Sequence, residues 1–269
     1  MYRLLALDLD GTLLRRDGVV DDRDVAAIAG LQAAGVIVTI VTGRLHSGAT
    51  GAARACQIEG AIGCVDGSHL VELSSGRTLV HHGLDGELTA VVRDAIARHG
   101  LASFVFDADG VHHEPGGAPY APYIRTWSPN LRIVEQDVAW QSEPLGAIAI
   151  GNPAEVAAAH AVLRAHAARL FSVSFETWTH PGKHALLVRA AGINKGTALA
   201  ELCQRAGVPL AEAVAIGDWI NDVPMFEVAG RSFAMGTAPD DVRAKATDGL
   251  LATAFDGGGI AEAIRCAWG

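Results

Sequence analysis

The N-terminal stretch reads Leu4-Leu5-Ala6-Leu7-Asp8-Leu9-Asp10-Gly11-Thr12, an apolar run that ends in two aspartates and a glycine. A short apolar run of this kind is typical of a strand that is buried on both faces of a parallel sheet. Asp8 and Asp10 come at the carboxyl end of this strand, and Gly11 allows the backbone to turn there. Because ligands of open α/β sheets bind at the carboxyl ends of strands, the stretch places two acids at a candidate site.

A helix and a second strand follow this first strand. Asp21 or Asp22 can cap the helix at its N-terminus, apolar residues recur on one of its faces, and Gly35 ends it. The run Val-Ile-Val-Thr-Ile-Val over 36–41 predicts a second buried strand, which ends at Thr42-Gly43-Arg44. Strand, helix and strand in this order form a βαβ unit with parallel strands and a right-handed crossover.

The C-terminal part of the chain repeats this alternation. It predicts, in order, a helix over 194–206, a strand over 213–217, a helix over 220–229, a strand over 231–235 and helices over 239–246 and 259–266. The fold class is therefore α/β, with a Rossmann-like doubly wound parallel sheet. Residues 1–80 and 187–269 together would form this catalytic core.

The middle of the chain, residues 81–186, has a different pattern. Helical periodicity over 85–99 and 153–168 is mixed with strand patterns over 103–107, 145–151 and 170–177. A stretch rich in proline, glycine and aromatic residues lies among them. Since helices and strands do not alternate regularly here, we expect an inserted α+β cap domain that governs substrate specificity.

The composition excludes several classes of protein. Of the 269 residues, 50% are hydrophobic and 19% are charged, a balance that is typical of folded globular proteins. The formal net charge of −9 argues against a nucleic-acid partner, which would need a basic face. No apolar run is long enough to span a bilayer, so no membrane partner is expected and a cytoplasmic location is predicted. The four cysteines are scattered, which favours reduced core thiols over a zinc site.

Further polar clusters follow predicted strands or open a predicted helix. Thr42 ends the second strand, Lys195 lies near the start of a helix, and the hexapeptide over 217–222 follows a strand and carries two more aspartates. If these clusters meet Asp8 and Asp10, four carboxylates share one pocket and a cation must neutralise them. An all-oxygen ligand set favours Mg²⁺. A hydroxyl group, a lysine and a helix N-terminus suit the oxygens of a phosphoryl group.

These clusters resemble the four ordered sequence motifs of the haloacid dehalogenase (HAD) superfamily. The matching segments are Asp8-Leu9-Asp10-Gly11-Thr12-Leu13-Leu14, Thr42-Gly43-Arg44, Asn194-Lys195-Gly196 and Gly217-Asp218-Trp219-Ile220-Asn221-Asp222. The resemblance implies that Asp8 attacks phosphorus, and that Asp10 protonates the leaving alcohol and then activates water. It also implies phosphate binding by Thr42, Gly43, Lys195 and Asn221, and Mg²⁺ binding by Asp8, the backbone carbonyl of Asp10 and Asp218. Asp222 would orient Lys195 or a metal-bound water, and Arg44 would touch the substrate or the cap, or form a surface ion pair.

Two features narrow the resemblance to one branch of the superfamily. Asp10 is the acid/base that phosphatases of the superfamily have and dehalogenases lack, so dehalogenation is not expected. Too few residues separate Asp8 from Thr42 for a second domain, so the insertion follows Thr42. This placement resembles the Cof-type subfamily IIB, which has an α+β cap of the C2 type. The implied function is magnesium-dependent hydrolysis of a small phosphorylated metabolite, such as a sugar phosphate, through an aspartyl phosphate.

The match to this branch departs from its usual pattern at two positions. Val65-Asp66-Gly67-Ser68 stands where the branch usually has Asn-Gly-Ala. Trp219 replaces a smaller residue. The first departure concerns contacts between cap and core and the second concerns the pocket wall, and neither removes a catalytic group.

Two other functions are weighed against the phosphatase. A phosphomannomutase-like phosphotransferase would need cationic side chains in the insertion for a second phosphate, and Arg125 and Arg132 are the candidates. A non-catalytic metabolite-binding protein of the same fold is disfavoured because all catalytic residue types are present. Candidates for substrate recognition in the insertion are His113, Tyr120, Tyr123, Trp178, His180 and Lys183. For each of them taken singly, an ordinary place in the core or on the surface is the favoured interpretation.

Overall fold

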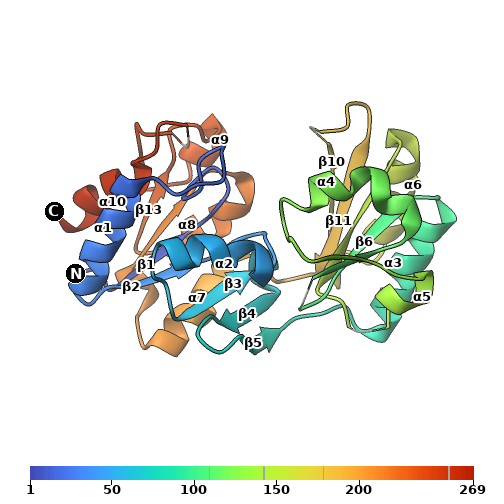
Figure 1. Ribbon diagram of the computed structural model, residues 1–269, viewed down its shortest axis with the longest axis horizontal. Coiled ribbons are helices and arrows are strands. Elements are labelled where there is room, and N and C mark those ends of the chain that lie inside the picture. The colour runs from blue at the N-terminus through green and yellow to red at the C-terminus, as the bar shows by residue number, and fades with distance from the viewer. Residues whose placement is uncertain (109, 142, 178, 254) are drawn as a thin grey trace. The chain divides into compact units, whose positions relative to one another are not determined.

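The computed structural model describes residues 1–108, 110–141, 143–177, 179–253 and 255–269, and for residues 136 and 137 it describes the backbone alone. The chain divides into two compact units (Figure 1). Unit 1 comprises residues 1–43, 49–79 and 194–269, and unit 2 comprises residues 44–48 and 80–193. Unit 1 is therefore assembled from three separate segments of the chain.

Unit 1 contains a five-stranded parallel sheet. In spatial order its strands are β14 (Asp248–Gly249), β13 (Arg231–Ala234), β12 (Ala213–Gly217), β1 (Leu4–Leu7) and β2 (Ile37–Ile40). β1 is the central one of these strands, and its Leu7 lies opposite Ile216 on one side and Ile40 on the other. All four side chains of β1 are fully buried, as the unbroken apolar run predicts.

Helices cover both faces of this sheet (Figure 1). They are α1 (Asp22–Ala33), most of α2 (His46–Ala55), α7 (Lys195–Ala206), α8 (Val223–Val228), α9 (Asp240–Arg243) and α10 (Gly259–Trp268), with the short 3-10 helices η3 (Leu210–Glu212) and η4 (Ile220–Asp222). The steps from β1 to β2 and from β12 to β13 run in opposite directions along the sheet, so right-handed connections place α1 and α8 on opposite faces. This doubly wound arrangement confirms the predicted α/β fold class.

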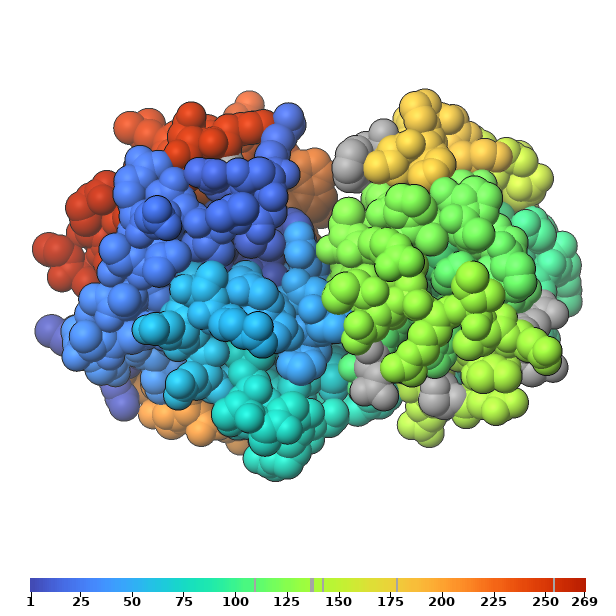
Figure 2. Space-filling view, viewed as in Figure 1, coloured from blue at the N-terminus to red at the C-terminus, as the bar shows by residue number. Residues whose placement is uncertain are grey.

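The two ends of the chain meet within unit 1. α1 packs against α10, and Trp268 Nε1 donates a hydrogen bond of 3.0 Å to the carbonyl oxygen of Tyr2. Figure 2 shows blue N-terminal and red C-terminal segments side by side on the surface of this unit. The fold therefore brings motifs from both ends of the sequence to one sheet.

A small antiparallel sheet extends unit 1 beyond β2. Its strands are β3 (Ala61–Cys64), β4 (His69–Glu72) and β5 (Arg77–His81). β3 reaches the main sheet through a parallel bridge between Val41 and Gly63. The 3-10 helix η1 (Val65–Gly67) follows β3, so Asp66 comes at the same edge as the residues that follow β1 and β2.

Capping residues determine where the helices of unit 1 begin. Asp21 caps α1, and its side chain accepts a hydrogen bond from the amide of Arg23. Asn194 caps α7, and its side chain accepts from the amides of Gly196 and Thr197. These side chains satisfy amides that have no partner inside the helix. The cap at Asn194 makes Lys195 the first residue of α7.

Unit 2 contains a six-stranded sheet. In spatial order its strands are β10 (Leu170–Glu176), β11 (His184–Ala190), β9 (Gly146–Gly151), β6 (Ala102–Phe106), β7 (Val111–His113) and β8 (Leu131–Ile133). Neighbouring strands are antiparallel except for β7 and β8, which are parallel. Unit 2 has its own hydrophobic core, to which β6 contributes Val105 and two helices contribute Leu88 and Val156.

Helices and sheet pack as separate layers in unit 2. Two long helices, α3 (Gly86–Arg98) and α6 (Pro153–Arg164), pack against each other, and α6 also packs against the sheet. The shorter helices are η2 (Pro115–Tyr120), α4 (Ala121–Ile124) and α5 (Gln136–Ala139). This is the α+β arrangement that the mixed pattern of the insertion predicts. In the described part of the whole chain, no helix combines the length and the apolar character needed to cross a membrane.

Candidate active site

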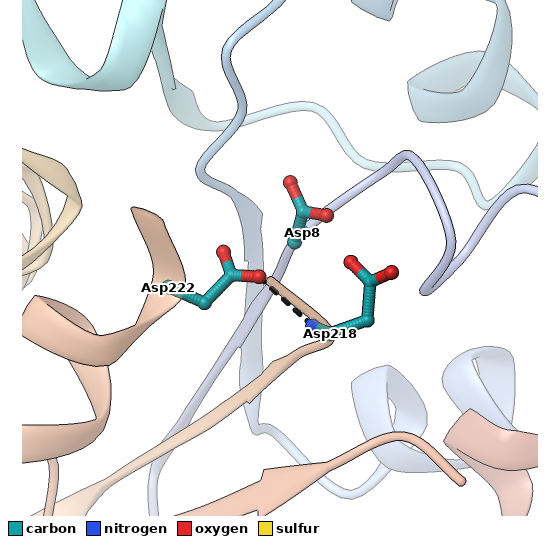
Figure 3. Close-up of side chains that lie close together, drawn as sticks. All are labelled: Asp8, Asp218 and Asp222. Carbon is teal, nitrogen blue, oxygen red and sulfur yellow. Dashed lines mark hydrogen bonds between the residues drawn. The ribbon is translucent and has the colours of Figure 1, made fainter. Parts of the chain in front are cut away.

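Three aspartates meet at the carboxyl edge of the main sheet in unit 1 (Figure 3). Asp8 follows β1, whereas Asp218 and Asp222 follow the neighbouring strand β12. Each of the three offers a carboxylate oxygen that lies within 4.8 Å of the other two. Because β12 pairs directly with β1, residues from opposite ends of the chain share one site.

Lys195 lies between two of these acids. Its Nζ donates hydrogen bonds to Asp8 Oδ1 at 2.6 Å and to Asp222 Oδ1 at 2.5 Å. The side chain is only 1% exposed, so both contacts are shielded from water. Burial lowers the pKa of Lys195, but the negative charges of Asp222 and Asp8 outweigh it, and the net shift of the pKa is upward. The lysine therefore remains a fixed positive charge.

Asp222 is fully buried, and both of its carboxylate oxygens accept hydrogen bonds. Oδ1 accepts from Lys195, and Oδ2 accepts from the amides of Asp218 (2.8 Å, dashed in Figure 3) and Trp219 (2.9 Å). A Cβ atom added to Gly217 would lie 2.4 Å from Asp222 Cγ, so the backbone packs directly on the carboxylate. Because protein donors already engage both oxygens, Asp222 suits the positioning of Lys195 better than metal binding.

The pocket carries an excess of negative charge, since three carboxylates face one lysine. Burial raises the pKa of Asp8 well above its usual value despite the adjacent Lys195. Burial and the charge of Asp222 raise the pKa of Asp218 to about 7. Asp218 Oδ1 is buried and accepts no hydrogen bond from the described residues. A cation between Asp8 and Asp218 would remove these penalties, and carboxylate oxygens are preferred ligands of Mg²⁺, so the residues fit a magnesium ion.

Gly11 brings the loop after β1 into close contact with Asp218. A Cβ atom at Gly11 would lie 2.1 Å from Asp218 Oδ2, and the φ angle of Gly11 is +80°, which side-chain-bearing residues rarely adopt. Asp10 is exposed, and its negative charge contributes to the raised pKa of Asp218. Asp10, which the sequence predicts to be the acid/base, therefore lies close enough to Asp218 for its charge to affect that residue.

Thr42, Gly43 and Asn221 lie around a further acid, Asp66. Thr42 is buried at the end of β2, and its carbonyl oxygen accepts a hydrogen bond of 2.9 Å from the amide of Asp66. Asn221 Nδ2 donates to Asp66 Oδ1 at 3.0 Å. Asp66 is not among the site residues predicted from the sequence. Its position directly after a short apolar run, like that of Asp8, is the signal that could have found it.

Arg44 belongs to the short segment of unit 2 that interrupts unit 1. Its NH1 donates a hydrogen bond of 3.2 Å to the carbonyl oxygen of Gly48. The two arginines predicted for a second phosphate, Arg125 and Arg132, are exposed on unit 2.

The recognition residues predicted for the insertion make internal contacts in unit 2. His113 and Tyr123 are buried, with the His113 ring 5.1 Å from that of Phe104 and the Tyr123 ring 5.5 Å from that of Trp127. Tyr120 contacts His180, with ring centroids 5.0 Å apart, and Lys183 Nζ donates a hydrogen bond of 2.7 Å to Asn152 Oδ1. Trp178 lies outside the described residues.

Sequence comparison relates this chain to known phosphatases. The profile of the haloacid dehalogenase-like hydrolase family matches residues 5–264. The chain is 28% identical over 241 residues to an HMP-PP phosphatase of Yersinia pseudotuberculosis, covering 88% of this chain and 85% of that protein. It is 25% identical over 264 residues to a pyridoxal phosphate phosphatase of Escherichia coli, covering 91% of each. A shorter match, 38% identical over 82 residues, covers 35% of a phosphoglycolate phosphatase of Nitrosopumilus maritimus and 30% of this chain.

Solved structures share the fold along the whole chain. A haloacid dehalogenase-like hydrolase from Bacteroides thetaiotaomicron superimposes with a TM-score of 0.85 at 22% identity and covers 100% of both chains. A sugar phosphatase of HAD subclass IIB superimposes with a TM-score of 0.79 at 20% identity and covers 98% of both.

Proposed function

Because this chain belongs to the haloacid dehalogenase-like hydrolases, we propose that it is a magnesium-dependent phosphatase, which hydrolyses a small phosphomonoester through an aspartyl phosphate on Asp8. The observation that carries the proposal is the buried contact of Lys195 with Asp8, beside Asp218. It supports the proposal because two carboxylates, which could serve as nucleophile and metal ligand, lie beside a fixed positive charge.

In the first step, an oxygen of Asp8 attacks the phosphorus atom of the substrate. A new P–O bond forms to Asp8 while the bond between phosphorus and the alcohol oxygen breaks. Lys195 orients Asp8 and offsets the negative charge of the phosphoryl group. Asp10 donates a proton to the departing alcohol oxygen. The step yields an aspartyl phosphate and a free alcohol.

In the second step, water attacks the phosphorus atom of the aspartyl phosphate. Asp10, now a carboxylate, accepts a proton from this water, and the bond between phosphorus and Asp8 breaks. Inorganic phosphate leaves and the Asp8 carboxylate is restored. Thr42, Gly43 and Asn221 hold phosphoryl oxygens in both steps, so that the attacking and leaving oxygens stay in line.

Magnesium would be held by Asp8, by the backbone carbonyl of Asp10 and by Asp218. When bound, the ion neutralises charge on the phosphoryl oxygens. Asp222 has a supporting role, because it holds the Lys195 ammonium and the amides of the loop that carries Asp218.

The substrate belongs, in this proposal, to small phosphorylated metabolites, with sugar phosphates as the first class to test. Unit 2 serves as the domain that selects among them, and the protein acts in the cytoplasm without nucleic acid or membrane. The names of two relatives that span most of the chain add HMP-PP and pyridoxal phosphate to the candidate substrates.

The decisive experiment measures phosphate release from a panel of phosphorylated metabolites with the full chain. Release should require Mg²⁺, stop on addition of EDTA and be absent from Asp8→Asn, whose circular dichroism spectrum should match the wild type. Turnover retained in Asp8→Asn would exclude the covalent route. Phosphorus NMR separates the alternative, because a phosphomannomutase-like phosphotransferase would produce an isomerised sugar phosphate without free phosphate.

A further inference from the structure

We propose that Asp66 is a positioning residue, which fixes the side-chain amide of Asn221 so that its NH₂ group faces a phosphoryl oxygen. The inference rests on the phosphate-binding role proposed for Asn221. It adds a residue outside the four motifs to the site and explains why an aspartate follows β3.

The backbone of Asp66 is tied to the strand that carries Thr42. β3 joins the main sheet through the bridge between Val41 and Gly63, and the amide of Thr42 donates to the carbonyl oxygen of Gly63 at 2.9 Å. The amide of Asp66 in turn donates to the carbonyl oxygen of Thr42, also at 2.9 Å. Asp66 is therefore held at the same edge of the sheet as the proposed phosphate-binding residues.

The turn that presents Asp66 has an unusual backbone. Val65 and Asp66 have φ angles of +50° and +51°, in the left-handed region that is strained for side-chain-bearing residues. A branched residue such as Val65 adopts this region very rarely. Hydrogen bonds from the Ser68 amide to the Val65 carbonyl oxygen and from the Asp66 amide to Thr42 hold the turn. The strained turn aims the Asp66 carboxylate at Asn221.

The carboxylate determines which way the amide of Asn221 points. An ionised carboxylate accepts hydrogen bonds and donates none, whereas an amide has a donating and an accepting end. Asp66 Oδ1 accepts from Asn221 Nδ2 at 3.0 Å, so the NH₂ end lies on this side. The second hydrogen of that NH₂ group can then donate to a ligand oxygen. An asparagine at position 66 could present either of its own ends and would not select one orientation.

Asp66 also lies against other parts of the phosphate site. A Cβ atom at Gly43 would lie 3.5 Å from Asp66 Oδ1. Asp66 is 7% exposed as a residue, and its negative charge contributes to the raised pKa of Lys195. Asp66 thus contacts Thr42 through its backbone amide and Asn221 through its carboxylate, which also lies close to Gly43 and places negative charge near Lys195.

The contact can be tested without magnesium and without turnover. In the ¹H–¹⁵N NMR spectrum of the full chain, the side-chain NH₂ pair of Asn221 is assigned by its loss in Asn221→Ser. In Asp66→Ala, exchange of these hydrogens with water should be at least roughly tenfold faster than in the wild type, as expected for loss of one hydrogen bond to a charged group. Unchanged exchange in Asp66→Ala would overturn the proposal.

The functional consequence is tested by calorimetric titration with inorganic phosphate in the presence of Mg²⁺. Asp66→Ala and Asn221→Ala should each weaken phosphate binding by about tenfold, and the double variant should bind no more weakly than Asn221→Ala alone. Asp66→Asn should recover part of the loss. Losses that multiply in the double variant, or no loss in Asp66→Ala, would show that Asp66 does not act through Asn221.

Asp24→Asn is the matched control. Asp24 is another buried carboxylate of unit 1, and it accepts hydrogen bonds from the amides of Gly258 and Ala261. Its variant should leave the exchange of the Asn221 NH₂ group unchanged, and any effect on phosphate affinity should multiply with that of Asn221→Ala. If the wild type hydrolyses no phosphomonoester but the two losses remain non-multiplicative, the proposed function fails while the role of Asp66 stands.

Discussion

Lys195 Nζ lies 2.6 Å from Asp8 Oδ1, and this buried contact joins residues that are 187 positions apart in the sequence. Lys195→Met should leave Asp8 and Asp222 without their shared cation. We expect kcat to fall by at least about a hundredfold to a thousandfold, and the free energy of unfolding to fall by about 3–5 kcal/mol. Steady-state kinetics and urea unfolding measure the two effects. Lys245→Met, at an exposed position, is the control and should change neither quantity appreciably.

Removal of the Asp218 charge should weaken magnesium binding. Asp218→Asn keeps the size of the side chain but replaces one carboxylate oxygen by an amide nitrogen, which does not bind Mg²⁺. We expect at least a roughly tenfold loss of Mg²⁺ affinity by isothermal titration calorimetry, because a hard cation depends on charged oxygen ligands. Asp94→Asn, at an exposed residue of unit 2, is the control. Equal affinities of Asp218→Asn and wild type would remove Asp218 from the metal site.

The stability of the metal-free protein should depend on pH through Asp218. Its pKa of about 7 in the folded chain is well above the ordinary value near 4 in an unfolded chain, so folding favours the protonated acid. The contribution of this group is therefore complete below about pH 4 and is lost as the pH rises to about 7. Thermal unfolding in EDTA should show Tm falling across this range. Added Mg²⁺ should reduce the fall, and a Tm that rises across this range in EDTA would contradict the assignment.

Gly11 should tolerate no side chain. A Cβ atom there would lie 2.1 Å from Asp218 Oδ2, and the φ angle of +80° adds strain. Gly11→Ala should therefore displace Asp218 and lower both Mg²⁺ affinity and kcat/KM by at least about tenfold. Gly18→Ala separates the clash with Asp218 from the backbone strain of a positive φ. Gly18 has a similar φ of +77°, but no atom lies within 4 Å of the added Cβ. The substitution should cost stability alone.

The acidic cluster could be predicted because its residues follow local patterns. Asp8 and Asp218 each come after a short apolar run, and such runs form β1 and β12. Lys195 follows an asparagine that caps a helix, so its place in the first turn of α7 also follows from neighbouring residues. Parallel strands end at a common edge, which is why local patterns were enough to bring these three side chains together.

Other parts of the structure depend on contacts that no local pattern encodes. α2 contains two glycines, which weaken its helical signal, and β3 is only four residues long. The position of Asp66 depends on the bridge between β3 and the end of β2. It is therefore set by tertiary contacts, which the residues around Asp66 do not encode. Unit 2 extends to Ile193, beyond the predicted boundary at 186, because β11 pairs with both β9 and β10.

Because unit 1 is assembled from three separate segments, neighbouring strands of its sheet are synthesised at different times. β1 leaves the ribosome before its sheet neighbour β12, which follows some 200 residues later, a delay of roughly 10–40 s at ordinary translation speeds. Over that interval one apolar edge of β1 has no strand beside it, and exposed edges of this kind invite aggregation. The acidic cluster of Asp8, Asp218 and Asp222 can therefore form only after Asp222 has left the ribosome.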